Sequence, residues 1–249
     1  MKIITLNLAR KDDLGEDYNA RIERIAKFLD QEHADIVCFQ EVSFSDTQSL
    51  ADDINQLMNT PYKNVWSELS RRCKISNIAP TKRATSMRKM YAKDKNAIFT
   101  DGEAIMSNLT LTKRVVTHLH KVPNDERGRR DPHPRIIQSI DFDNIKISNI
   151  HFAANNNAYL QLKETLDKTK HDRIIIGDFN MTSEQIIKHR TMWQSDYSEA
   201  SETYNYISFP ADGVAYDHVL VPKQLKLKSL KTKDNLSDHN AVIIEITHL

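Results

Sequence analysis

Short apolar runs recur along the chain, and most of them are rich in isoleucine and valine. Runs of this length with many β-branched residues, separated by polar stretches, are typical of buried strands. We therefore predict strands at residues 2–8, 35–40, 97–100, 104–107, 113–119, 135–142, 145–151, 172–177, 214–221 and 241–247.

A second pattern, with apolar residues three or four positions apart, predicts helices. It is clearest over residues 17–32, and it recurs over residues 46–58, where Asp46 or Thr47 would cap the first turn. Helices are also predicted over residues 157–170 and 183–190.

The order of these elements indicates the fold class. The chain begins β-α-β-α-β and then alternates strands with helices, including several pairs of strands that could form hairpins. This mixture favours an α/β (α+β) fold, a four-layer sandwich of two packed, mostly antiparallel β-sheets flanked by helices. Glycine is scarce, with five residues, and no Pro/Gly-rich linker divides the chain, so residues 1–249 are predicted to form a single domain.

Charge is unevenly distributed, although the formal net charge is only +1. Residues 67–96 contain nine Lys or Arg and two acidic residues, so this segment carries +7 and the remainder of the chain −6. The segment also lacks steady apolar periodicity. We interpret it as a basic insertion or long functional loop that contacts an anionic partner.

Several classes of protein are disfavoured by composition. Two cysteines do not make a disulfide framework. The N-terminal residues resemble a strand more than a signal peptide, and no apolar run approaches the length of a membrane span. We therefore expect a monomeric, cytoplasmic protein with no membrane span.

Four polar clusters stand at the ends of apolar runs, where functional groups are usually displayed. They are Asn7, Gln40-Glu41, Gly177-Asp178-Phe179-Asn180 and Ser237-Asp238-His239. Any one of them alone is more often a turn or a cap. Their joint occurrence at strand ends in one chain favours a functional site.

Together with other segments, these clusters resemble the endonuclease/exonuclease/phosphatase, or DNase I-like, superfamily. The matching segments, in the family's order, are Ile-Thr-Leu-Asn7, Phe-Gln-Glu41-Val, Gly102-Glu-Ala-Ile-Met-Ser107, Ser-Asn-Ile-His151-Phe, Gly-Asp178-Phe-Asn180, Tyr-Asp217-His-Val-Leu and Ser-Asp238-His239. The resemblance covers nearly the whole chain and implies a metal-dependent phosphoesterase.

The resemblance also implies a metal site. Glu41 would be the principal ligand, with Asn7 and Asp238 nearby. Carboxylate and amide oxygens suit a hard cation, so Mg²⁺ or Mn²⁺ is expected rather than Zn²⁺. The cation would assist in-line attack on a phosphoester.

The remaining matched residues are implied to act on water and phosphate. Asp178 would orient or deprotonate the attacking water, and Asn180 would help to hold the water or a phosphate oxygen. His239 would contact the scissile phosphate, and Asp217 would fix its tautomer and favour its charged form. His151 would donate to a second phosphate oxygen. The neighbouring His218 should point to the opposite face of its strand.

Specificity is the most open question. A second basic cluster, Arg127, Arg129, Arg130 and Arg135, precedes the strand at 135–142. Two basic clusters favour a polyanionic substrate, with nucleic acid among the candidates. The expected substrate-binding residues are Arg71, Arg72, Arg88, Lys89, Arg130 and Arg135.

Three functions are compatible with these residues. The first is a nuclease or phosphodiesterase, and the alternative is a phosphatase or phosphodiesterase acting on inositol phosphates or phospholipid head groups. A catalytically inactive binding module of the same fold is a remote third, because the polar set is intact. Apurinic endonucleases carry a tyrosine-containing segment where this chain has His151, which disfavours abasic-site repair.

Overall fold

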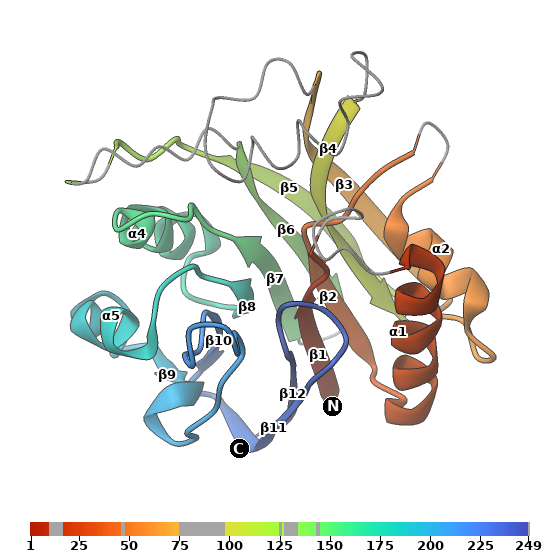
Figure 1. The fold of residues 1–249 in the computed structure, drawn as a ribbon. Coiled ribbons are helices and arrows are strands. Elements are labelled where there is room, and N and C mark those ends of the chain that lie inside the picture. The colour runs from red at the N-terminus through yellow and green to blue at the C-terminus, as the bar shows by residue number, and fades with distance from the viewer. Residues whose placement is uncertain are drawn as a thin grey trace.

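The computed structural model describes residues 1–9, 17–45, 48–74, 98–124, 126, 134–142 and 145–248. In this part of the chain, two six-stranded sheets pack against each other (Figure 1). The first sheet consists, in spatial order, of β11 (Leu225–Lys233), β12 (Ala241–His248), β1 (Lys2–Asn7), β2 (Ile36–Gln40), β4 (Ile98–Ser107) and β3 (Asn64–Lys74). The second consists of β5 (Lys113–Leu119), β6 (Arg135–Phe142), β7 (Ile145–His151), β8 (Ile174–Asp178), β10 (Asp217–Pro222) and β9 (Tyr197–Glu199).

Both sheets are mixed, with one parallel pair at the centre of each. In the first sheet β1 pairs in parallel with β2, and in the second β7 pairs in parallel with β8. The other neighbouring pairs are antiparallel. The carboxyl ends of a parallel pair lie at the same edge of a sheet, so each sheet brings two strand ends together.

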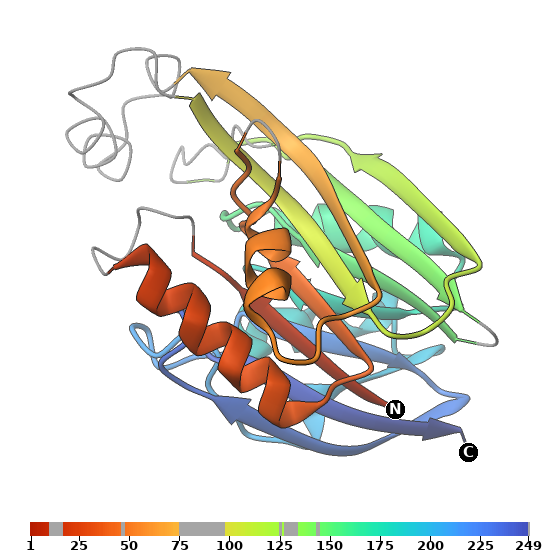
Figure 2. The same cartoon turned by 90° about the vertical axis from the view of Figure 1, so that its right-hand side faces the viewer.

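Helices cover the outer faces of both sheets, as the two views in Figures 1 and 2 show. The helices α1 (Tyr18–Glu32) and α2 (Leu50–Leu57) pack on the first sheet, and α4 (Ala158–Thr169) and α5 (Ser183–Lys188) on the second. Two short 3₁₀ helices, Arg190–Met192 and Ala200–Glu202, precede and follow β9. The predicted four-layer arrangement is confirmed. No helix among the described residues is long and apolar enough to cross a membrane.

Side-chain alternation along the central strands produces three apolar layers. On β1, Ile4 and Leu6 face α1, whereas Ile3 faces the second sheet. On β8, Ile174 and Ile176 face the first sheet, whereas Ile175 faces the helices. All of these side chains are fully buried. The near-continuous apolar runs of the central strands therefore reflect burial on both faces.

Local capping chemistry decides where two helices begin. Asp17 accepts a hydrogen bond from the backbone N–H of Ala20 and starts α1. Helix α2 begins at Leu50, after a capping box in which Ser49 and Asp52 exchange hydrogen bonds. Ser49 is therefore the cap, in place of the predicted Asp46 or Thr47, which lie outside the described residues.

Three strands were not predicted from the sequence. They are β3, β9 and β11, all at sheet edges. Strand β3 extends to Lys74, so the first residues of the basic segment 67–96 belong to the sheet. The two runs predicted at 97–100 and 104–107 form one strand, β4.

Candidate active site

The polar clusters come together where the central strands of both sheets end. Asn7 is the last residue of β1, and its Cα partner is Gln40, the last residue of β2. In the second sheet His151 and Asp178 are Cα partners at the ends of β7 and β8. Asp217 begins the antiparallel β10 and is itself paired with Asp178. The strand pairing therefore gathers residues that are far apart in the sequence.

Asp178 is the centre of the cluster. Its Oδ2 accepts a hydrogen bond from Asn7 Nδ2 at 3.0 Å, which joins the two sheets. Its Oδ1 accepts the backbone N–H of Asn180 at 2.8 Å. His151 Nε2 lies 3.6 Å from Asp178 Oδ2, and His239 Nε2 lies 4.0 Å from the same atom. One carboxylate thus faces an amide and two imidazoles.

The electrostatic environment makes Asp178 a suitable proton acceptor near neutrality. Burial and the charge of Asp217 raise the pKa of Asp178 to about 6. The charge of His239 and the hydrogen bonds from Asn180 and Asn7 counteract part of this rise. A general base is most effective when its pKa is close to the working pH.

His239 and Asp217 form a tight pair. His239 Nδ1 lies 2.7 Å from Asp217 Oδ2, and both residues are buried. Burial alone would lower the pKa of His239, but the charge and hydrogen bond of Asp217 raise it to about 10, with help from Asp178 and Asp238. The imidazole is therefore a cation at neutral pH, and its Nε2 is directed toward the side of Asp178.

Two residues of the cluster have an uncommon backbone conformation. Glu41, which follows β2, has φ 54°, and Asn180 has φ 49°. Left-handed conformations are uncommon for residues other than glycine and are over-represented at functional sites. Glu41 is only 6% exposed, and Asn180 Nδ2 donates to the carbonyl of Phe152 at 2.9 Å. These turns direct both side chains into the protein.

A divalent cation fits the chemistry of this site. Glu41, Asp178 and Asp217 are buried carboxylates, and burial together with the negative charge of Asp217 raises the pKa of Asp178. A bound cation would relieve that repulsion. Asp178, Asp217 and His239 also have ligand atoms within 4.8 Å of one another. The hydrogen bond and raised pKa of His239 make it a poor ligand, so the cation suits the carboxylate and amide oxygens better.

The other two expected metal ligands flank this cluster. Asn7 is 2% exposed, and its Oδ1 accepts the backbone N–H of Ala9. Asp238 is half-buried, accepts a hydrogen bond from Ser237 Oγ and contributes to the raised pKa of His239.

Of the expected substrate-binding residues, three lie in the part of the chain that the structure describes. Arg71 is half-buried on the edge strand β3, and Arg72 is the next residue of the same strand. Arg135 is 4% exposed and contributes a charge that acts on the buried Glu103. Arg135 is therefore enclosed in the protein, and its role in binding substrate stays a prediction. Arg88, Lys89 and Arg130 lie outside the described residues.

Sequence reasoning did not single out Ser208, which organises the His239–Asp217 pair. Its Oγ accepts a hydrogen bond from the backbone N–H of Asp217 at 2.9 Å. Its backbone carbonyl accepts a hydrogen bond from the backbone N–H of Asn240 at 2.7 Å. It therefore ties the start of β10 to the residue after His239. The neighbouring Phe209 packs its ring 4.8 Å from the His239 ring. Neither residue has a motif around it that could have predicted the contact.

His218 also has a structural partner that the sequence did not reveal. As predicted, it points away from the active-site cluster, and it is fully buried. Its Nδ1 lies 2.9 Å from Glu199 Oε1, and its Nε2 is 2.8 Å from the carbonyl of Met181. The pair anchors β10 to the edge strand β9.

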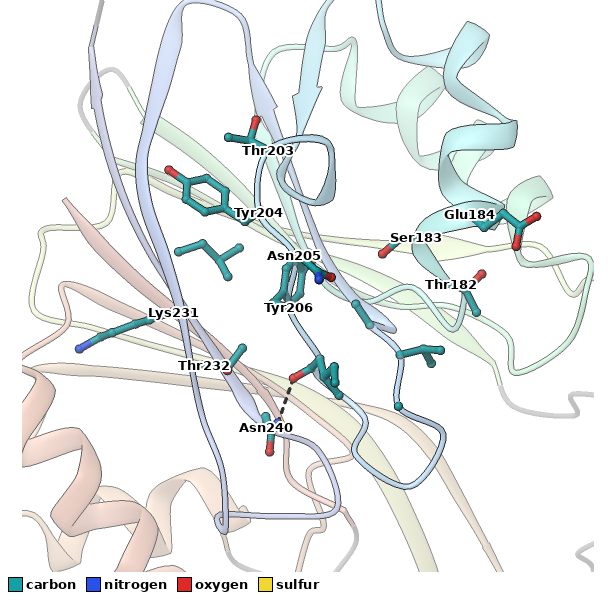
Figure 3. Close-up of a pocket in the computed structure, with 15 residues that line it drawn as sticks. Thr182, Ser183, Glu184, Thr203, Tyr204, Asn205, Tyr206, Lys231, Thr232 and Asn240 are labelled. Carbon is teal, nitrogen blue, oxygen red and sulfur yellow. Dashed lines mark hydrogen bonds between the residues drawn. The ribbon is translucent and has the colours of Figure 1, made fainter.

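A groove of about 910 Å³ lies beside the cluster. Figure 3 shows its hydroxyl and amide side chains, which come from the start of α5, from the segment before β10 and from β11. Asn240, the residue after His239, is part of its wall. None of the candidate catalytic or metal residues lines it. The groove is thus a neighbour of the active site and a separate cavity.

Comparison with known proteins agrees with this fold. The sequence profile of the Endonuclease/Exonuclease/phosphatase family matches residues 4–239. No curated protein matches the sequence itself. Among solved structures, an endonuclease/exonuclease/phosphatase from Beutenbergia cavernae has a TM-score of 0.74 at 15% identity, over 99% of this chain and 71% of that one.

Two further similar structures have named activities. A mannosyl-6-phosphatase from Bacteroides thetaiotaomicron has a TM-score of 0.62 at 13% identity, over 99% of both chains. A 3′ phosphatase from Neisseria, bound to a product DNA hairpin, has a TM-score of 0.60 at 16% identity, also over 99% of both chains. At these identities the likeness concerns the fold.

The fold and the carboxylate–imidazole cluster define a phosphoester hydrolase. The chain belongs to the Endonuclease/Exonuclease/phosphatase family, whose members are phosphoesterases that generally use a divalent metal.

Proposed function

We propose that the protein is a Mg²⁺- or Mn²⁺-dependent phosphodiesterase, in the first instance a nuclease. The observation that carries the proposal is the position of Asp178, which contacts Asn7 from the other sheet and faces both His151 and His239. Attack of water on a phosphate anion requires a base whose pKa is near neutrality and a cation held beside it. Asp178 and the charged imidazole of His239 meet these two requirements.

The bound metal would be held by Glu41, Asn7 and Asp238. It would supply Lewis-acid stabilisation of the charge on the phosphoryl oxygens and on the ester oxygen that leaves as the water oxygen bonds to phosphorus. The protein groups divide the remaining work. Asp178 accepts the proton of the attacking water, and the Asn180 side chain, held by Phe152, helps to orient that water.

The imidazoles act on the phosphate. His239, kept cationic by Asp217, donates to a non-bridging oxygen whose negative charge grows during the reaction. His151, whose Nε2 lies 3.6 Å from Asp178 Oδ2, donates to a second oxygen. Because these donors are positioned before substrate arrives, little reorganisation is needed in the transition state.

A phosphatase acting on a phosphomonoester is the second candidate. It is favoured by the structural likeness to the mannosyl-6-phosphatase and the 3′ phosphatase. Inositol phosphates and phospholipid head groups belong to this candidate. A panel with Mg²⁺, containing single- and double-stranded DNA, RNA, bis(p-nitrophenyl) phosphate and inositol phosphates, separates the two. Cleavage of monoesters alone would reject the phosphodiesterase.

The basic segment offers a test for a polymeric substrate. Each Lys or Arg that contacts a phosphate releases counterions, with a log–log salt slope near −0.7 to −0.9 per contact. Reversing Arg71, Arg72, Arg88 and Lys89 to Glu should raise KM for nucleic acid and flatten this slope. Turnover of bis(p-nitrophenyl) phosphate should barely change. Equal kinetics on both substrates and an unchanged slope would show that the segment does not bind the polymer.

A further inference from the structure

A layer of buried amides joins the two sheets directly beneath the active site. Gln40 on β2 and Asn149 on β7 are both fully buried. Gln40 Nε2 donates to Asn149 Oδ1 at 2.7 Å and to Thr5 Oγ1 at 3.0 Å. This bond connects the first sheet to the second beside an apolar layer that consists mainly of Ile and Val side chains.

Asn149 also makes hydrogen bonds to backbone groups at the end of the β2–β4 strand pair in the first sheet. Its Nδ2 donates to the carbonyls of Phe39 at 2.9 Å and Ala104 at 3.2 Å. These two residues are the last Cα partners of β2 and β4. A side chain of one sheet therefore satisfies backbone groups of the other where its strands separate. Gln138 extends the layer, with its Oε1 3.3 Å from Asn149 Nδ2.

The bridge adjoins three residues of the active site. Gln40 immediately precedes Glu41, and Asn149 is two positions before His151 on the same strand. Gly177, which precedes Asp178, passes so close that a Cβ there would lie 3.1 Å from Gln40 Nε2. Any shift of the amides would therefore be transmitted to both halves of the site.

The two halves of the site belong to different sheets. Asn7 ends β1 and Glu41 follows β2, both strands of the first sheet, and the loop with Asp238 leads into β12 of the same sheet. Asp178 and His151 end strands of the second. Apolar contacts between sheets are non-directional, whereas an amide pair fixes relative position. The metal half and the water-activating half are held in register by directional bonds of this kind.

We infer that Gln40 and Asn149 are positioning residues that set the metal-binding half of the active site against the half that activates water. The inference rests on the proposed assignment of Glu41 and Asp178 to these two halves. The bridge touches neither water nor phosphate. It controls how far Asp178 stands from the metal ligands.

The division between the sheets gives the test a distinctive signature. Gln40→Met and Asn149→Leu keep approximate volume but remove the bridge. Since the proposed metal ligands all come from the first sheet, Mn²⁺ affinity measured by calorimetry should stay within about threefold of wild type. The kcat should fall about 100-fold, the effect of a displacement of roughly 1 Å at a reacting centre.

A matched control lies on the same strand. Ser148 is buried next to Asn149 but on the opposite face, where its hydroxyl bonds only to Ser139 Oγ at 2.8 Å among the described residues. Ser148→Ala should lose some thermal stability and keep its kcat. The double variant Gln40→Met/Asn149→Leu should lose no more kcat than Asn149→Leu alone, because Asn149→Leu already removes the bridge.

Several results would overturn the inference. A kcat within threefold of wild type in a destabilised variant would make the bridge purely structural. A parallel loss of Mn²⁺ affinity and kcat would indicate general disruption of the site. If Asn149→Leu does not fold, Asn149→Ser takes its place, because serine adds no apolar bulk. If wild type cleaves p-nitrophenyl phosphate but not bis(p-nitrophenyl) phosphate, the proposed phosphodiesterase fails, and the kcat ratios on the monoester still decide the inference.

Discussion

At the residue scale, His239 and Asp217 are expected to act as one unit. Asp217→Asn and His239→Ala should each lower kcat by roughly 10³–10⁴-fold, and the double variant should be little worse. The physical reason is the 2.7 Å contact that keeps the imidazole charged and oriented. Steady-state kinetics of the three variants provide the measurement. Effects that multiply would show that the two residues work independently.

The same pair predicts a pH effect. Asp217 is the main group that raises the pKa of His239 to about 10. In Asp217→Asn the pKa of His239 should fall. The residual activity of this variant should therefore begin to decline at a lower pH than the activity of wild type. A kcat–pH profile from pH 6 to about 11 follows the descending limb.

Gly177 illustrates a residue whose role is steric. It has φ 140°, and an added Cβ would lie 2.1 Å from the carbonyl of Ile150. Gly177→Ala should therefore destabilise the protein by ~3 kcal/mol or more, from backbone strain and overpacking together. Gly213 is the control, because its φ is 69° but a Cβ there would meet nothing within 4 Å. Gly213→Ala should cost only about 1–2 kcal/mol in chemical denaturation. An equal loss of unfolding free energy in Gly177→Ala and Gly213→Ala would contradict the close approach of Gly177 to the carbonyl of Ile150.

At the element scale, the central strands of the described sheets were predictable, whereas three of the four edge strands, β3, β9 and β11, were not. Central strands such as β8 are fully buried and read as continuous apolar runs. Strand β11 alternates Leu with Lys, and a bulge between Leu227 and Ser229 shifts its period. Strand β3 carries charged residues at a sheet edge. Edge strands commonly carry charge, which weakens the pattern by which strands are recognised.

The buried pair that anchors β10 to β9 predicts a pH-dependent stability. Burial alone would lower the pKa of His218, but the charge and hydrogen bond of Glu199, with the carbonyl of Met181, raise it above its usual 6.5. A raised histidine pKa contributes stability that is complete below about pH 6.5 and is lost as pH rises through the folded-state pKa. His218→Asn should lower the free energy of unfolding by roughly 3 kcal/mol or more at pH 6.

The difference in the free energy of unfolding between wild type and His218→Asn should therefore decrease as pH rises. Urea denaturation of both proteins at pH 6 and pH 10, without metal, measures it. His120→Asn is a surface control, since that imidazole is 89% exposed. A difference that stays constant or widens with pH would mean that His218 is neutral in the folded protein.

At the scale of the whole molecule, the motifs predicted which strand ends belong to the candidate site, and the topology determined how those ends meet. Asn7 and Asp178 are 171 positions apart, yet one hydrogen bond joins them across the sheets. The sequence could suggest this only through resemblance to a family. The contacts of Gln40 with Asn149 and of Ser208 with Asp217 depend on the exact packing of the sheets and loops, which no local pattern encodes.

The site as a whole lies at the junction of the two sheets, with the proposed metal ligands on one side and the proposed base on the other. The most direct test compares wild type with Glu41→Ala on bis(p-nitrophenyl) phosphate, in excess chelator and after addition of Mg²⁺ or Mn²⁺. Wild type should be inactive in chelator and recover with metal, whereas Glu41→Ala should stay folded by circular dichroism and inactive throughout. Full turnover of wild type in chelator, or of Glu41→Ala with metal, would contradict metal-dependent catalysis through Glu41.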